Sequence, residues 1–236
     1  MDNVEYLISR TALHNINLTK EQATKIVDFL NFLVKYNENV NLTSILNFKD
    51  MVYKHIIDSL LIFNVLNIRE NMNLLDVGAG AGFPSTPIAI VEKFKNILQI
   101  DSSQKKIDFL IKVRDMFNLK IEIKNIRAEY AAKLENFREK FCVVTARAVA
   151  KLNILCEYCI PFVKLGGFFV ALKGPNYEDE LVVSKKAINV LGGKLIKAEK
   201  FELLNNSTRV FIVIEKVART PFKYPRNYSK ILKNPI

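Results

Sequence analysis

The chain has 236 residues, three cysteines and a formal net charge of +11 at pH 7, with a pI near 9.5. This length suits one α/β domain with a short extension, and the odd cysteine count argues against a disulfide scaffold and for a reducing compartment. No apolar run reaches about 18 residues, and acid follows Met1 where a signal peptide carries base, so we expect a cytoplasmic protein. The charge favours a polyanionic partner, although a lysine- and asparagine-rich genome gives the same excess.

Helical patterns fill the first third of the chain. Thr19 and Gln22 form a capping box before apolar residues at helical spacing, which predicts an amphipathic helix. Further helices are expected over 2–14 and 50–66, and this third has no strand pattern. We therefore expect residues 1–70 to form a helical extension packed on the core.

From residue 73 onward, short apolar runs alternate with helical patterns, which is typical of βαβ units with a parallel sheet. Residues 194–204 and 208–217 instead form two strand-like runs joined by Asn205, Asn206 and Ser207, which predicts a terminal hairpin. The five earlier strands are expected near 73–77, 96–100, 120–126, 142–145 and 168–172. We therefore expect a Rossmann-like α/β core over 71–217, followed by a basic tail over 218–236.

A glycine-rich stretch follows the first predicted strand. Gly78 lies two residues after Asp76, and Gly80 and Gly82 follow at intervals of two. A strand that ends in a glycine turn and leads into a helix offers free backbone N–H groups and close approach to a ligand. The spacing D-x-G-x-G-x-G differs from the G-x-G-x-x-G of dinucleotide-binding folds and is similar to the loop of Rossmann-like S-adenosylmethionine methyltransferases. Another nucleotide-binding fold or a purely structural turn are the alternatives.

Polar residues close the later strands at the edge where open α/β sheets bind ligands. Asp101 ends the second strand, where its carboxylate accepts hydrogen bonds from ribose hydroxyls or caps the helix after Ser102. Arg147 and Lys173 end the fourth and fifth strands and place two cations at one mouth, either to hold a phosphate or carboxylate or as solvated charges. After the third strand, Ala128 and Glu129 offer an amide and a carboxylate to an adenine edge, or cap a helix.

Several motifs occur together along nearly the whole chain, and in order and spacing they resemble the bacterial small-subunit rRNA guanine-N7 methyltransferase family, also called glucose-inhibited division protein B. They are Asn41-Leu-Thr43, His55-Ile-Ile-Asp58-Ser59-Leu60, Asp76 to Pro84, Asp101-Ser102, Arg127-Ala128-Glu129, Ala146-Arg147-Ala148, Ala171-Leu-Lys-Gly174 and Thr220 to Arg226. Ala146 departs from the pattern, since some relatives carry Ser there, which puts one hydroxyl contact in doubt.

The resemblance implies a Rossmann-like fold and transfer of a methyl group from S-adenosylmethionine to N7 of one guanine in the decoding-region loop of 16S rRNA. It implies a partner in 16S rRNA or the small subunit, and we expect a monomer with no metal and no membrane contact. The cofactor residues that we expect are Gly78, Gly80, Gly82, Phe83, Asp101, Ser102, Ala128, Glu129 and Arg147. Arg147 and Lys173 are the expected catalytic residues, and Lys105, Arg127, Lys173, Lys223 and Arg226 the expected RNA contacts.

The chain has no evident catalytic dyad, which suits this chemistry because guanine N7 has an unprotonated lone pair at neutral pH and needs only an in-line approach. Cys156 and Cys159 form a C-x-x-C, but it lies in a helical apolar pattern without a second pair, so we expect no redox or metal role. His55 and Asp58 share one helical face and either pair with each other or face the mouth of the site.

The tail has cations interleaved with Phe222, Tyr224 and Tyr228 and lacks acidic residues. Charges bind phosphates and aromatic rings stack on unpaired bases, so the tail is expected to bind RNA and to affect cofactor affinity little. A tail that packs its aromatic residues on the core is the alternative, and three prolines argue against a regular helix. Two other functions remain open, a nucleotide-dependent oxidoreductase and a non-catalytic RNA-binding module that retains a cofactor fold.

Overall fold

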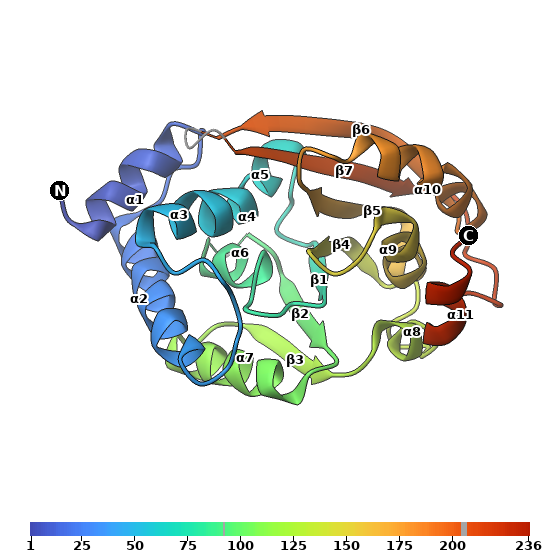
Figure 1. Cartoon of the computed structure of the whole chain (residues 1–236), viewed down its shortest axis with the longest axis horizontal. Coiled ribbons are helices and arrows are strands. Elements are labelled where there is room, and N and C mark those ends of the chain that lie inside the picture. The colour runs from blue at the N-terminus through green and yellow to red at the C-terminus, as the bar shows by residue number, and fades with distance from the viewer. Residues whose placement is uncertain (92, 204–206) are drawn as a thin grey trace.

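A computed structural model describes residues 1–91, 93–203 and 207–236, and over these residues the chain forms a seven-stranded sheet between two layers of helices (Figure 1). The strand order is β3-β2-β1-β4-β5-β7-β6, with β7 antiparallel to both of its neighbours. The strands are β1 (Asn73–Val77), β2 (Asn96–Asp101), β3 (Ile121–Asn125), β4 (Phe141–Arg147), β5 (Val163–Lys173), β6 (Gly193–Glu202) and β7 (Thr208–Lys216). The α/β prediction and the parallel start of the sheet are confirmed.

All seven predicted strands form, and their limits differ most at β5. This strand begins at Val163 rather than near residue 168, because its first half carries exposed residues and Gly166 at φ +73°, so its pattern is not apolar. The predicted hairpin is present as β6 and β7, whose register runs from Gly193 opposite Lys216 to Glu202 opposite Thr208. Of its predicted connection, Asn205 and Asn206 lie outside the described residues.

The helices cover both faces of the sheet. Apolar residues of the N-terminal helices, α6 and α7 form one buried cluster with strands of the sheet, and residues of α9 and α10 form a second cluster on the opposite face. The helices are α1 (Asn3–Ala12), α2 (Lys20–Asn37), α3 (Phe48–Met51), the π-helix η1 (Val52–Ile57), α4 (Asp58–Leu60), α5 (Ile62–Val65), α6 (Ser85–Val91), α7 (Gln104–Met116), α8 (Ala128–Ala131), α9 (Leu152–Cys159), the 3₁₀-helix η2 (Ile160–Phe162), α10 (Glu178–Val190) and α11 (Tyr228–Lys233).

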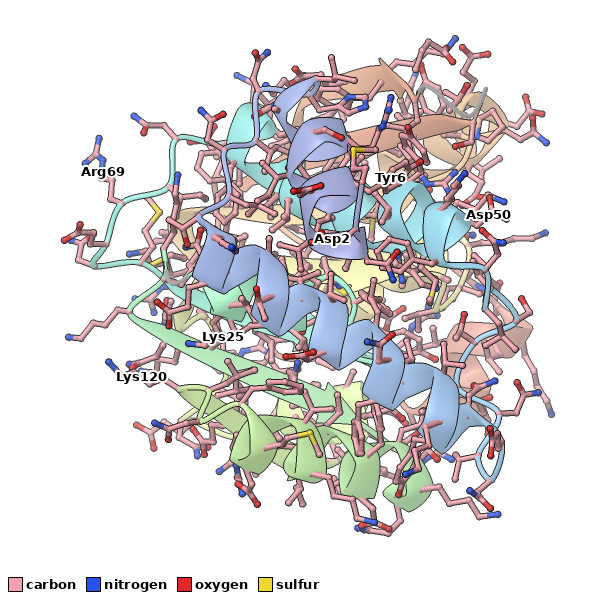
Figure 2. The ribbon with its side chains drawn as sticks, turned by 90° about the vertical axis from the view of Figure 1, so that its left-hand side faces the viewer. Asp2, Tyr6, Lys25, Asp50, Arg69 and Lys120 are labelled. Carbon is pink, nitrogen blue, oxygen red and sulfur yellow. The ribbon has the colours of Figure 1, made fainter. Side chains whose placement is uncertain are left out.

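The first third of the chain is helical, as predicted, and the Thr19 capping box forms with both of its hydrogen bonds. Figure 2 shows α1 and α2 on the outer surface of this layer, with Asp2 at the start of α1 and Lys25 directed outward from α2. Inside, the ring of Phe29 packs 5.4 Å from that of Phe83, between centroids. The helices therefore contribute directly to the core that supports the glycine-rich loop.

The tail differs from the prediction in one respect. A short helix, α11, forms between Pro225 and Pro235, because six residues without proline are enough for one capped turn and a half. Asn227 caps it by accepting a hydrogen bond from the Lys230 N–H at 3.0 Å. Ile231 of this helix is fully buried and Tyr224 packs on the second cluster, whereas Phe222 is exposed, so only part of the tail packs on the core.

Two further structural findings concern the length of the helices and the state of the cysteines. The helices contain no segment long and apolar enough to span a membrane, within the residues that the structure describes. Cys142, Cys156 and Cys159 are buried free thiols, and burial raises the pKa of Cys156 and Cys159 well above the ordinary value, which keeps them protonated and unreactive.

Candidate active site

The glycine-rich loop connects β1 to α6 at the carboxyl edge of the sheet. Its three glycines have positive φ, +72°, +57° and +89° for Gly78, Gly80 and Gly82, a region that disfavours side chains. A Cβ on Gly82 would lie 2.4 Å from Thr86 Oγ1, so this glycine allows α6 to start close to the strand. A Cβ on Gly80 would meet only the Gly78 carbonyl, at 3.7 Å, so Gly80 leaves open space above the loop.

Asp76, the last but one residue of β1, fixes the two ends of this loop through hydrogen bonds. Its side chain is buried and accepts hydrogen bonds from the hydroxyls of Ser85 and Thr145, the second at 3.0 Å. Burial raises the pKa of Asp76 to about 6, with the hydroxyl donors opposing the shift. The acid of the D-x-G motif therefore joins β1, α6 and β4 beneath the loop and is enclosed by protein.

A pocket of about 260 Å³ lies beside the loop at the carboxyl ends of β1, β2 and β3. Of the predicted cofactor residues it includes Gly78, Asp101, Ser102, Ala128 and Glu129, and it also includes Arg127 from the predicted RNA contacts. The remaining lining residues are Val77, Ile100, Lys106, Ile126, Ala148, Val149, Tyr158 and Tyr228. We call it the strand-end pocket.

Asp101 connects the pocket to the loop. One carboxylate oxygen, Oδ2, accepts the Gly80 N–H at 3.0 Å, and Oδ1 accepts the Ser103 N–H at 2.9 Å. Lys106 Nζ lies 3.9 Å from Oδ2. The contact with Ser103, which is the N-cap of α7, shows that Asp101 also orders the start of that helix, so the structure supports part of the capping alternative. The carboxylate still lines the pocket and retains lone pairs for a ligand.

Two polar atoms in the pocket are buried without a hydrogen-bond partner in the described residues, Glu129 Oε1 and the Tyr158 hydroxyl. Glu129 is 3% exposed, and its closest cation is Arg127, 4.0 Å away. Burial and the Glu129 charge raise the pKa of Tyr158 to about 12, so its hydroxyl keeps its proton. Because unpaired buried polar groups are costly, these two atoms indicate that a polar ligand completes the pocket.

Tyr158 and Tyr228 are pocket residues that the sequence did not predict. Tyr158 lies in α9 between the two cysteines, where the helical apolar pattern hides it, and Tyr228 begins α11 in the tail. The Arg127 guanidinium lies over the Tyr228 ring, 4.9 Å from its centroid. Tyr228 therefore brings the tail to the wall of the strand-end pocket.

A second hollow, of about 310 Å³, adjoins the first, and Ala148 lines both. Arg147 and Lys173, the cations predicted at adjacent strand ends, line it together with Lys54 and Arg209. Its other lining residues are Ile45, His55, Asp58, Ala148, Leu172 and Gly174. The sequence thus predicted the location of the two strand-end cations, and we call this space the cationic hollow.

Arg147 is held by several groups of the helical segment. Its Nη1 donates to Asp58 Oδ2 and to the Lys54 carbonyl, both at 2.9 Å, and its guanidinium lies 5.0 Å over the centre of the Phe83 ring. Arg209 Nε approaches Asp58 Oδ1 at 3.3 Å as an ion pair without hydrogen-bond alignment. Asp58 therefore binds two arginines from different strands.

His55 is neutral at this position. Burial, and secondly the Arg147 charge, lower the pKa of His55 to about 3. Its Nε2 lies 3.0 Å from Thr43 Oγ1, and its Nδ1 lies 3.1 Å from the Lys54 carbonyl and 3.2 Å from Arg147 Nη2. The ring also stacks on Phe83, 4.3 Å between centroids. Both ring nitrogens are thus engaged, and the predicted motif residues His55 and Asp58 each contact Arg147.

Lys173 is also paired. Its Nζ donates to Glu180 Oε2 at 2.6 Å and to the Ala150 carbonyl at 2.9 Å, which joins β5 to α10 and to the segment that follows β4. Phe83, Gly80 and Gly82 lie in or under the loop and outside the lining of the strand-end pocket. Lys105, Lys223 and Arg226 line neither space.

The parallel strands with an antiparallel β7, the glycine-rich loop and the acid at the end of β2 define the class of Rossmann-like S-adenosylmethionine-dependent methyltransferases. Among solved structures, the fold is similar to that of a putative methyltransferase from Bacillus halodurans, with a TM-score of 0.51 and 13% identity over 68% of this chain and 99% of the other. It is also similar to TYW2 of M. jannaschii in complex with AdoMet, with a TM-score of 0.50 and 18% identity over 63% and 71% of the two chains.

The chain belongs to the rRNA small subunit methyltransferase G family, whose pattern matches residues 22–208. It is 42% identical to ribosomal RNA small subunit methyltransferase G of Lactobacillus helveticus over 238 residues, 99% of both chains. It is 40% identical to the protein of the same name from Clostridium kluyveri over 229 residues, 94% of this chain and 93% of the other. The expected family is confirmed, and with it a small-subunit rRNA methyltransferase that uses S-adenosylmethionine.

Proposed function

We propose that this protein transfers the methyl group of S-adenosylmethionine to N7 of one guanine in the decoding-region loop of 16S rRNA. The observation that carries the proposal is the adjacency of the strand-end pocket and the cationic hollow, which share Ala148. The first space has the carboxylates of a nucleoside site, and the second has the cations that an RNA segment needs. The family supports a small-subunit rRNA substrate.

The pocket residues fit the cofactor. Asp101 is proposed to accept hydrogen bonds from the ribose hydroxyls, and Ser102 to lie beside them. The backbone of Ala128 and the unpaired Glu129 Oε1 are proposed to meet the adenine edge, where an amino group would satisfy that oxygen. Gly78, Gly80, Gly82 and Phe83 are proposed to shape the loop against the methionine part. The bound cofactor supplies an electrophilic sulfonium methyl group.

The proposed transfer forms one N7–carbon bond while one sulfur–carbon bond breaks, and the positive charge passes to the purine ring without release of a proton. No general base is needed, which agrees with a cationic hollow in which His55 is engaged at both nitrogens and Asp58 is paired with arginines. The residues need to orient the guanine in line with the methyl group at about 3 to 3.5 Å.

Arg147 and Lys173 are proposed as the cations that hold a phosphate, guanine O6 or the cofactor carboxylate. A cation placed directly on N7 would oppose the charge that develops there. Each of these cations already binds an acid, Asp58 and Glu180 respectively, and this pairing reduces the positive potential at the wall of the hollow. Arg147 lines the cationic hollow and directly precedes Ala148, the residue that both spaces share.

Lys105, Arg127 and Lys223 are proposed RNA contacts, since all three are exposed. Arg226 is better explained as a structural residue, because three of its nitrogens bind Glu157 through the side chain and backbone. We further propose a monomer that acts in the cytoplasm, with the helical extension 1–70, the core 71–217 and the tail 218–236 working as one unit.

The test uses small subunits that lack the modification, incubated with the protein and labelled S-adenosylmethionine. N7-methylguanine carries a positive ring that borohydride reduces, after which aniline cleaves the strand. We expect one cleavage in the decoding-region loop, none without protein, and a weaker cleavage with the Asp101→Ala variant when the methyl donor is below saturation. Labelled rRNA that resists this treatment would move the methyl group to another atom and exclude the N7 proposal.

A further inference from the structure

A basic surface runs along the amino edge of the sheet, opposite the strand-end pocket. A hollow of about 760 Å³ lies at the starts of β1, β2, β3 and β4, and its cations are Lys95, Arg114, Lys120, Lys124 and Lys140. Figure 2 shows Lys120 directed outward at the margin of the molecule, on the same side as Arg69. The five residues of β1 separate this edge from the carboxyl edge by about 17 Å at roughly 3.3 Å per residue.

The hollow continues on both sides. A smaller one of about 230 Å³ shares Lys95, Ile97 and Lys120 with it, and another of about 440 Å³ shares Lys140. The latter adds the cations Lys133, Arg138 and Arg219 and ends at the ring of Phe222. We name these three connected hollows the amino-edge track.

The charges of the track are largely available. Within the described residues, Lys95, Lys120 and Lys140 form no ion pair, whereas Lys124 pairs with Glu122 at 2.9 Å and Arg114 with Asp115 at 2.8 Å. Three acids line the track: Glu122 is bound to Lys124, Glu139 is bound to buried Lys216 at 3.2 Å, and exposed Glu135 offsets one of the free cations. The track therefore presents an excess of free positive charge to whatever lies in it.

Phe222 gives the track a second property. This ring is 93% exposed, and the Arg138 guanidinium lies 5.6 Å from its centroid, held by carbonyl groups of the tail, including that of Tyr224 at 2.9 Å. An exposed aromatic ring at the end of a basic groove is the arrangement that binds single-stranded nucleic acid, through phosphate contacts and base stacking. The ring of Phe222 belongs to neither of the two buried apolar clusters of the described residues.

We propose that the amino-edge track binds a second segment of the 16S rRNA, one that does not contain the target guanine. This inference rests on the proposed rRNA substrate and extends it. The phosphates of that segment lie against Lys95, Lys120 and Lys140, and an unpaired base stacks on Phe222. Because the track and the cationic hollow lie on opposite edges of the sheet, a short target loop cannot reach both, whereas a folded subunit can.

The test compares Lys120→Gln/Lys140→Gln with the control Lys185→Gln/Lys186→Gln, which removes the same charge from exposed positions of α10 outside the three hollows. Binding to small subunits and to naked 16S rRNA is measured over a salt series. We expect the track variant to bind both roughly tenfold more weakly at low salt, with a salt slope shallower by about 0.7 for each lost contact. The control should match the unchanged protein.

Two further measurements separate the track from the active site. Methylation of a short stem-loop that carries only the target loop, and affinity for S-adenosylhomocysteine, should both be unchanged in the track variant. Phe222→Ala should weaken rRNA binding without changing the salt slope, because stacking releases no counterions. The unfolding midpoint of each variant checks that the fold is intact.

The outcomes are distinct. Equal binding and equal slopes for the track and control variants overturn the proposal, as does a loss seen with subunits but absent with naked rRNA, which would assign the track to a ribosomal protein. Binding is measured without methyl transfer, so a methyl group found on another atom would contradict the proposed function and leave this test valid.

Discussion

Arg147 donates a hydrogen bond to Asp58 at 2.9 Å, which joins the end of β4 to the helical segment that precedes the sheet. Asp58 is 2% exposed, and Arg209 of β7 approaches its other oxygen at 3.3 Å. One carboxylate from the first third of the chain therefore sets the position of two cations of the cationic hollow. Its removal leaves two arginines close together without a counter-charge.

We predict that Asp58→Ala lowers the free energy of unfolding by about 3 to 5 kcal/mol, the usual loss when one partner of a buried ion pair is removed. The matched control is Asp50→Ala, since Asp50, labelled in Figure 2, pairs with Lys54 at 3.0 Å but its side chain is 45% exposed. The control should change stability by about 1 kcal/mol at most. Urea unfolding measures both, and equal losses would show that Asp58 is not an essential counter-ion.

The second prediction concerns pH and His55. Its pKa is about 3 in the folded protein and near 6.5 when unfolded, so the unfolded chain binds more protons as the pH falls below 6.5. By linkage, folded-state stability is lost as the pH decreases from about 6.5 toward about 3. Between pH 7 and pH 5 the loss should be about 2 kcal/mol.

His55→Gln should lack this component, so its unfolding free energy should vary less between pH 7 and pH 5. His14→Gln is the comparison, because His14 is the other histidine of the chain and lies away from Arg147. It should retain most of the pH dependence. A His55 variant with the same pH profile as the unchanged protein would contradict the assignment.

A third prediction tests the strand-end pocket. Asp101→Ala should weaken S-adenosylhomocysteine binding by about 1 to 3 kcal/mol, since it removes a charged hydrogen-bond acceptor from the ribose side. Asp108→Ala is the control, because Asp108 is an exposed carboxylate in the second turn of α7 and lies outside the lining of the pocket. Calorimetry gives the affinities and thermal unfolding reports the loss of the Gly80 contact. Unchanged affinity in a folded Asp101 variant would remove this residue from the site.

Local patterns predicted the fold and the positions of the strand-end residues, because strands and their last residues are encoded by short runs of sequence. Asp101, Arg147 and Lys173 each follow an apolar run, so their meeting at one edge follows from parallel strands. The partners of these residues were not predictable in the same way. Asp58 lies 89 positions from Arg147, and no periodicity connects them.

The tail illustrates the second limit. Its charges and aromatic residues are the same whether it binds RNA or packs on the core, so composition does not distinguish the two. The burial of Ile231 and the place of Tyr228 in the pocket wall show which part of the tail packs on the core, and both depend on where α9 lies, whereas Phe222 remains exposed. Tyr158 was missed for a similar reason, since it lies in the apolar pattern of α9, which gives no indication that its hydroxyl faces a pocket.

The fourth prediction separates two aromatic residues of the tail. Tyr228→Ala should weaken S-adenosylhomocysteine binding, because it opens the pocket wall opposite Arg127, whereas Phe222→Ala should not, because that ring lies on the amino-edge track. We expect a loss of about 0.5 to 1.5 kcal/mol for the first, the usual value of an aromatic ring contact. Tyr228→Phe should bind normally. An equal effect of both alanine variants on cofactor affinity would show that Tyr228 acts only through the fold.

The last prediction concerns the attachment of the tail. Arg226 binds Glu157 through Nε at 2.9 Å, Nη2 at 2.6 Å and its backbone N–H at 2.7 Å, and Glu157 is 1% exposed. Arg226→Ala leaves a buried carboxylate without its cation and should cost about 3 to 5 kcal/mol of unfolding free energy.

Lys223→Ala is the matched control, since Lys223 is an exposed cation three residues earlier in the same tail. It should leave stability unchanged and reduce the salt slope of rRNA binding by about 0.7 if it contacts one phosphate. Deletion of residues 218–236 should combine both effects and also weaken cofactor binding, because it removes Tyr228. If the truncated protein unfolds at the same urea concentration and binds S-adenosylhomocysteine as before, the tail is a separate RNA-binding arm and the structural role of Arg226 is wrong.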